Sequence, residues 1–93
     1  MNIFADLQKY AQKYDVKESR LFDAEELAII SSAKVVPSQY GLSVCFYMKS
    51  GCQQFIPLST NSVAKVGDVV DVTTCRVLTL DRDGADTINR IEL

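Results

Sequence analysis

The 93-residue chain contains no histidine, only three cysteines and no Cys-x-x-Cys pair. Structural zinc sites are usually built from four cysteine or histidine ligands, so this chain lacks the ordinary ligand set. An odd number of cysteines also cannot pair completely within one chain. We therefore expect Cys45, Cys52 and Cys75 to be free thiols in a reducing cytoplasm, and we expect no metal site.

Features of an active site are equally scarce. The sequence has no histidine base, no glycine-rich phosphate loop and no nucleophile beside a catalytic partner. Its one pair of adjacent glutamates, Glu25-Glu26, is explained more simply as a solvated helix start or strand edge. We expect a binding protein without catalytic activity and without a cofactor.

Long apolar runs are also missing. The longest spans only a few residues, whereas a membrane-spanning helix needs about 20. Asp6, lysines and tyrosines interrupt the N-terminal stretch MNIFADLQKYAQKYD, where a signal peptide needs a continuous apolar segment. The chain has no Pro/Gly-rich linker and no internal repeat, and its length suits one domain. We therefore expect a cytoplasmic single-domain protein with no membrane association.

Acidic residues are absent from the middle of the chain. The formal net charge is −2, yet residues 27–67 contain Lys34, Lys49 and Lys65 and no acid. Two explanations remain open. One is that buried strands exclude carboxylates in any sequence, and the other is that the segment forms an electropositive face.

Residues 2–14 have the spacing of an amphipathic helix. Asn2 suits the N-cap, and apolar side chains recur at intervals of three and four at Phe4, Leu7, Ala11 and Tyr14. A helix this short needs a surface to cover. We therefore assign residues 1–15 to an N-terminal helix that closes a barrel or binds a second subunit, which predicts a homo-oligomer. Residues 16–93 form the single β-barrel domain.

The segment 23–36 carries conflicting signals. Asp23 followed by Glu26 is typical of a capping box and favours a helix. The β-branched residues at 29, 30, 35 and 36 favour a strand that ends at Pro37. We predict a strand over 28–36.

Residues 40–58 are predicted to form a hairpin. Apolar side chains alternate along 40–48, which is typical of a strand with one dry face. A three-residue loop at 49–51, with Gly51 at positive φ, places four side chains on the outer face: Tyr47, Lys49, Gln53 and Phe55. A two-residue loop would shift the register by one and bury Phe55 against Phe46.

The remaining pattern is a polar connection over 59–66, a turn at 66–68, a strand at 75–81, the turn RDGA and a last strand at 87–93. With strands at 28–36 and in the hairpin, the fold class is mainly β. We expect five antiparallel strands on short connections, preceded by one α-helix. The pattern over residues 28–93 resembles the oligonucleotide/oligosaccharide-binding (OB) fold, a five-stranded partly open barrel. Residues 59–66 are too few for the helix that many members of that fold place there. An SH3-like barrel is the alternative.

The resemblance implies single-stranded DNA or RNA bound without sequence preference across the second and third of these strands. The residues at matching places are Tyr47, Lys49, Gln53 and Phe55. Lys34 and Tyr40 are expected nearby, and Lys65 completes the predicted binding residues. Stacking one base on an aromatic ring contributes about 1–3 kcal/mol. Three phosphate contacts give a log–log salt slope of only about −2, so a monomer should bind weakly.

A second hypothesis remains open at this point. The same face, or the N-terminal helix, could bind another protein, which would make the chain an interaction or assembly module. A small self-contained subunit of this kind would suit a phage or a mobile element.

Overall fold

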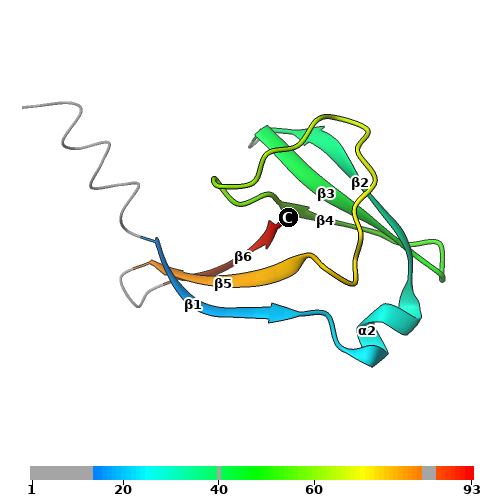
Figure 1. Cartoon of the computed structure of the whole chain (residues 1–93), viewed down its shortest axis with the longest axis horizontal. Helices are drawn as coiled ribbons and strands as arrows, with labels where there is room; N and C mark the ends of the chain where they lie inside the picture. Colours follow the sequence, from blue (N-terminus) through cyan, green and yellow to red (C-terminus); the bar gives the residue numbers. More distant parts are fainter. Residues whose placement is uncertain (1–13, 40, 83–85) are drawn as a thin grey trace, which may run out of the picture.

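Two three-stranded antiparallel sheets make up the structure. The computed structural model describes residues 14–39, 41–82 and 86–93, which form six strands and one short helix (Figure 1). The elements are β1 Tyr14–Leu21, α2 Ala24–Ile29, β2 Ile30–Ser38, β3 Gly41–Met48, β4 Gln53–Pro57, β5 Arg76–Arg82 and β6 Asp86–Glu92. The strand orders are β1-β5-β6 and β2-β3-β4, and every pair within them is antiparallel. The prediction of a mainly antiparallel β-fold is confirmed.

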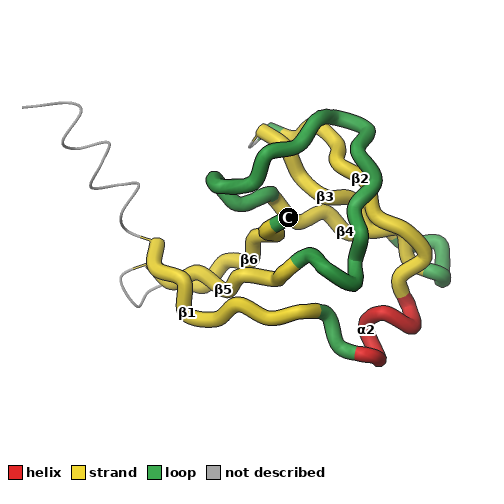
Figure 2. The backbone as a smooth tube through the Cα atoms, viewed as in Figure 1, coloured by secondary structure: helices red, strands yellow, loops and turns green. Residues whose placement is uncertain are grey.

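The two sheets meet at two places without closing into a barrel. Leu58 and Ile91 form an isolated parallel bridge, where the Ser59 N–H donates to the Ile91 carbonyl at 2.8 Å. At the other end, α2 connects β1 to β2 (Figure 2). The predicted five-stranded barrel is not confirmed, because β1 is a sixth strand and the sheets stay separate.

β1 occupies the end of the predicted N-terminal helix. Tyr14 and Asp15 pair with Arg82 and Asp81 of β5, so the helix cannot include them. Pairing with β5 satisfies the backbone hydrogen bonds that a helix would otherwise have supplied. Residues 1–13, and with them most of the predicted helix, lie outside the described residues.

The segment 23–36 contains both structures that its sequence favoured. Asp23 and Glu26 form a reciprocal capping box, in which the Glu26 N–H donates to Asp23 Oδ1 at 2.8 Å. This box starts α2, so the strand prediction is wrong at residues 28 and 29, which are helical. It is confirmed over 30–36, where pairing with β3 gives the β-branched residues a sheet to pack in.

The hairpin has the predicted three-residue loop. Tyr47 lies opposite Gln53 and Cys45 opposite Phe55, and the Met48 N–H donates to the Cys52 carbonyl at 2.9 Å. Gly51 has φ +94°, a conformation that costs little only for glycine. This register places the Phe55 ring at the surface, with 59% of its area exposed.

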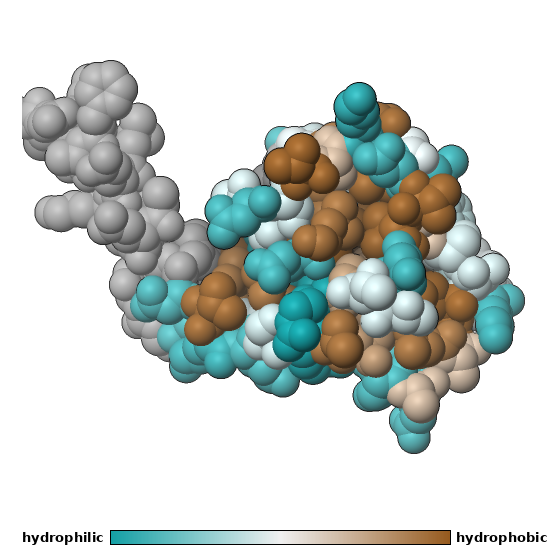
Figure 3. Space-filling model, viewed as in Figure 1, coloured by the Kyte–Doolittle hydropathy of each residue, from teal (hydrophilic) through white to brown (hydrophobic). Residues whose placement is uncertain are grey.

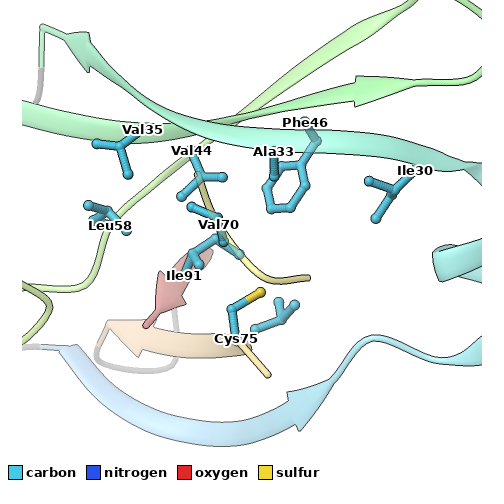
Figure 4. Close-up of a cluster of buried hydrophobic side chains, with 10 residues drawn as sticks. Ile30, Ala33, Val35, Val44, Phe46, Leu58, Val70, Cys75 and Ile91 are labelled. Atoms are coloured by element: carbon cyan, nitrogen blue, oxygen red, sulfur yellow. The ribbon is translucent and has the colours of Figure 1, made fainter. Parts of the chain in front are cut away.

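Both sheets contribute to one hydrophobic core. Val35 and Val44 of β2 and β3 point toward Ile91 of β6, and all three are fully buried (Figure 4). Phe46 packs edge-to-face on Phe22, with ring centroids 5.4 Å apart. Burying one such side chain stabilises the fold by about 1.5–3 kcal/mol, so each sheet depends on the other.

The connection from β4 to β5 runs along the free edge of β2. The Val35 N–H donates to the Asp68 carbonyl, and the Val70 N–H donates to the Ala33 carbonyl. Gly67 makes the predicted turn at φ +94°. The predicted strands at 75–81 and 87–93 correspond to β5 and β6, and residues 83–85 of the predicted turn lie outside the described residues. Over the described ranges, no helix is long and apolar enough to cross a bilayer.

Candidate nucleic-acid interface

One row of side chains crosses the outer face of sheet β2-β3-β4. Lys34, Cys45 and Phe55 lie directly opposite one another on the three strands. Because neighbouring strands are about 4.8 Å apart, the Cα atoms of Lys34 and Phe55 are separated by roughly 10 Å. Both side chains are exposed, so the register brings two predicted site residues onto one surface.

The next row contains Ser32, Tyr47 and Gln53. Tyr47 is half-buried, and it is the diagonal neighbour of Phe55 across the β3–β4 pair. A hydrogen bond with the Cys45 thiol raises the pKa of Tyr47 above its ordinary value of 10. The phenol is therefore neutral at pH 7 and adds no negative charge to the face.

The middle of the face is more buried than simple alternation predicts. Ser43 and Cys45 point away from the core, yet they are only 2% and 1% exposed. They are small residues on the central strand, and longer side chains such as Lys34 and Phe55 lie on either side. The buried Ser43 hydroxyl donates to Ser38 Oγ at 2.9 Å. The prediction that every odd-numbered side chain of the hairpin faces water is wrong at these two positions.

The other predicted site residues lie at the margins. Lys49 is exposed at the hairpin tip, where its backbone N–H donates to the Ile29 carbonyl. Lys65 is exposed in the β4–β5 connection, where its backbone N–H donates to the Asp68 carboxylate. The register places neither side chain in a row with Phe55. Tyr40 lies outside the described residues.

The three strands of the face hold no acidic residue, whereas Asp68 of the β4–β5 connection lies beside Val35 at the β2 edge. None of the three strands contains a carboxylate, and the only charged residue among them is Lys34. The ion pairs of the described ranges are Lys17–Asp81, at 3.3 Å, and Arg20–Glu26. Both lie outside sheet β2-β3-β4, so within that part of the chain Lys34 has no carboxylate bound to it.

Val69 is a surface residue that the sequence analysis did not select. It bridges to Lys34 and is 83% exposed, which extends the row to four residues. Val63 and Val66 are exposed on the same connection, where hydrophobic side chains gather in Figure 3. The sequence held no signal that separates Val69 from its neighbour, since Val70 is the same residue type and only the structure shows that Val70 is buried.

No three histidine, cysteine, aspartate or glutamate residues in the described ranges gather in a way that could hold a metal ion. No protein-family model, no curated protein and no solved structure matches the chain. The candidate interface therefore depends on its own geometry and charge.

Proposed function

We propose that the protein binds single-stranded DNA or RNA, without sequence preference, on the outer face of sheet β2-β3-β4. The observation that carries the proposal is the row joining the exposed Phe55 ring to Lys34 on a sheet without carboxylates. A single exposed apolar side chain is ordinary on a protein surface, so the proposal depends on the ring sharing its row with a lysine and not on the exposure of Phe55 alone.

The chemistry of the face suits an unpaired strand. A base can stack on Phe55, with Tyr47 beside it, and stacking is tolerant of sequence because every base has a π-face. Lys34 lies across the sheet to meet a phosphate, and Lys49 and Lys65 stand at the margins. With few side chains able to read base edges, mainly Gln53 and Ser32, we expect weak discrimination between bases.

The arrangement of the strands also supports the proposal. A path from β2 through β3 and β4 crosses the Leu58–Ile91 bridge to β6, continues through β5 to β1 and returns along α2. This path outlines an incomplete barrel. The parallel contact between Leu58, just after β4, and Ile91 of β6 is similar to the strand arrangement of an OB fold. The OB fold binds oligonucleotides on the matching face.

The test is fluorescence anisotropy with labelled oligo-dT and oligo-U at low and high salt. We expect binding that weakens with salt, and a loss of about 1–3 kcal/mol, roughly 5- to 150-fold, for Phe55→Ala. Leu21→Ala is the matched control, because Leu21 is an exposed apolar residue of the other sheet. No binding at low salt, or equal binding by wild type and Phe55→Ala, would contradict the proposal.

A further inference from the structure

In the described residues no strand is hydrogen-bonded to the outer edge of β4, although β6 lies near this strand. In the described part of the chain β4 pairs only with β3. After Pro57, Leu58 forms an isolated bridge with Ile91 of β6. The Cys52 carbonyl and the Leu58 N–H both point to β3. Because backbone groups alternate along an antiparallel ladder, the N–H and C=O groups of Gln53 and Phe55 point to the open edge.

This edge lacks the protection that the other open edge has. β1 is the corresponding edge of the second sheet, and it carries four charged residues and a bulge between Val16 and Glu18. Charges and bulges are the usual means of preventing strands from pairing with another chain. β4, with the sequence QQFIP, has no charge and a regular register, and its one proline lies at the end next to the bridge.

We propose that two copies of the chain pair through β4, antiparallel about a two-fold axis at Gln54. In such a dimer each edge residue meets its own symmetry mate or a near neighbour, so like charges would repel. The uncharged edge removes that repulsion. Centring on Gln54 places Gln53 opposite Phe55 of the second copy, which allows four main-chain hydrogen bonds. Pro57 then falls opposite Gly51 of the second copy, beyond these bonds.

A cavity beside this edge is positioned to receive the second copy. It has a volume of about 440 Å³ and is lined by Ala28, Ile29, Met48, Lys49, Ser50, Cys52 and Gln54. In the proposed register Ile56 of the second copy lies opposite Cys52, with its side chain on the same side of the sheet as Gln54. The Ile56 side chain is partly buried against the core of its own chain, so the group of the second copy that lies nearest the cavity is the exposed amide of Gln54.

The dimer would join two outer faces into one six-stranded sheet. Phe55 of each copy would lie beside Gln53 of the other, so each copy contributes a residue to the proposed binding surface. This consequence rests on the proposed function, whereas the dimer itself does not. Doubling the lysines along one strand of nucleic acid would offset the small charge of a single copy.

Cross-linking tests the register directly. In a Cys52→Ser background, Gln54→Cys places two thiols at a non-hydrogen-bonded pair, where Cα atoms are about 4.5 Å apart and a disulfide can form. Phe55→Cys in the same background is the matched control, because its symmetry mate lies diagonally at about 7–8 Å. We expect a covalent dimer on non-reducing gels for the first variant alone. Equal cross-linking of both variants, or of neither, would overturn the register.

Sedimentation velocity without nucleic acid tests the dimer independently. We expect twice the 10.3 kDa chain mass at high protein concentration. Gln54→Lys should reduce it to one chain mass by placing like charges at the axis, while Glu18→Lys on the β1 edge should leave it unchanged. A wild-type protein that stays at one chain mass up to its solubility limit, or a dimer that Gln54→Lys does not weaken, would overturn the proposal. A Phe55→Ala variant that forms the dimer but does not bind oligonucleotide would show that dimerisation does not depend on nucleic-acid binding.

Discussion

The two sheets are the same size and differ almost completely in charge. Each contains 22 residues in three antiparallel strands. Sheet β1-β5-β6 carries ten charged residues, five of each sign, whereas sheet β2-β3-β4 carries Lys34 alone. Secondary structure and burial alone therefore do not set surface chemistry in this fold.

The difference in charge indicates different roles for the two sheets. Charges on sheet β1-β5-β6 form ion pairs and protect its open edge, as in the Lys17–Asp81 pair. Sheet β2-β3-β4 leaves an aromatic ring, a lysine and an unprotected edge at the surface. Both proposals concern that second sheet, because it combines an exposed aromatic ring with a strand edge that carries no charge.

The largest expected effect tests whether the two sheets unfold together as one cooperative unit. Ile91 is fully buried at the bridge between them, so Ile91→Ala should cost about 2–5 kcal/mol. Urea unfolding followed by circular dichroism would measure the cost, with amide exchange at Val44 and Val77 reporting on each sheet. Val16→Ala, at an exposed site, should cost little. Loss of protection at Val77 alone would mean that the sheets unfold separately.

A smaller effect concerns the loop that sets the register of sheet β2-β3-β4. Gly51 has φ +94° with open space around it, so Gly51→Ala adds backbone strain without a clash. We expect a loss of about 1–2 kcal/mol in the free energy of unfolding, measured by urea titration. Lys49→Ala, in the same loop, is the control, because Lys49 donates to the Ile29 carbonyl through its backbone N–H, which the substitution keeps. A Gly51→Ala variant as stable as wild type would show that the loop tolerates another geometry.

The sequence predicted local features better than long-range ones. Alternation and Gly51 were enough for the hairpin register, and with it the exposure of Phe55. The capping box at Asp23 was visible but was outweighed by β-branched residues that belong to the strand after it. The burial of Cys45 depends on side chains from β2 and β4, and the pairing of Val69 with Lys34 joins residues 35 positions apart. Neither follows from a local pattern, since both arise from tertiary contacts.

The stability contributed by the junction between the sheets, at α2, depends on pH. Hydrogen bonds from Arg20 and from the Asp23 N–H lower the pKa of Glu26 from 4.5 to about 2. A lowered pKa in the folded state contributes stability above pH 4.5, and this contribution is lost as the pH falls toward 2. Because the pair is partly exposed, we expect Glu26→Gln to cost only about 1 kcal/mol at pH 6.

Urea unfolding of wild type and Glu26→Gln at pH 6 and pH 2.5 would check this. The difference in free energy of unfolding should shrink at the lower pH, where wild-type Glu26 loses its charge in the unfolded chain and begins to lose it in the folded one. Glu25→Gln, at an exposed neighbour, should show no such trend. A difference that stays constant with pH would mean that the Arg20–Glu26 pair contributes nothing to stability.

The smallest effect concerns the absence of acidic residues from the strands of sheet β2-β3-β4. Gln53→Glu would place a carboxylate beside Phe55 on the face that has none, and Thr87→Glu would make the same change in net charge on the already charged sheet. If the oligonucleotide lies on sheet β2-β3-β4, one added acid cancels about one phosphate contact. The log–log salt slope of binding should then fall by about 0.7 for Gln53→Glu and stay unchanged for Thr87→Glu. Equal slopes for the two variants would show that the nucleic acid responds only to the overall charge of the protein, and the contrast between the sheets would have no role in binding.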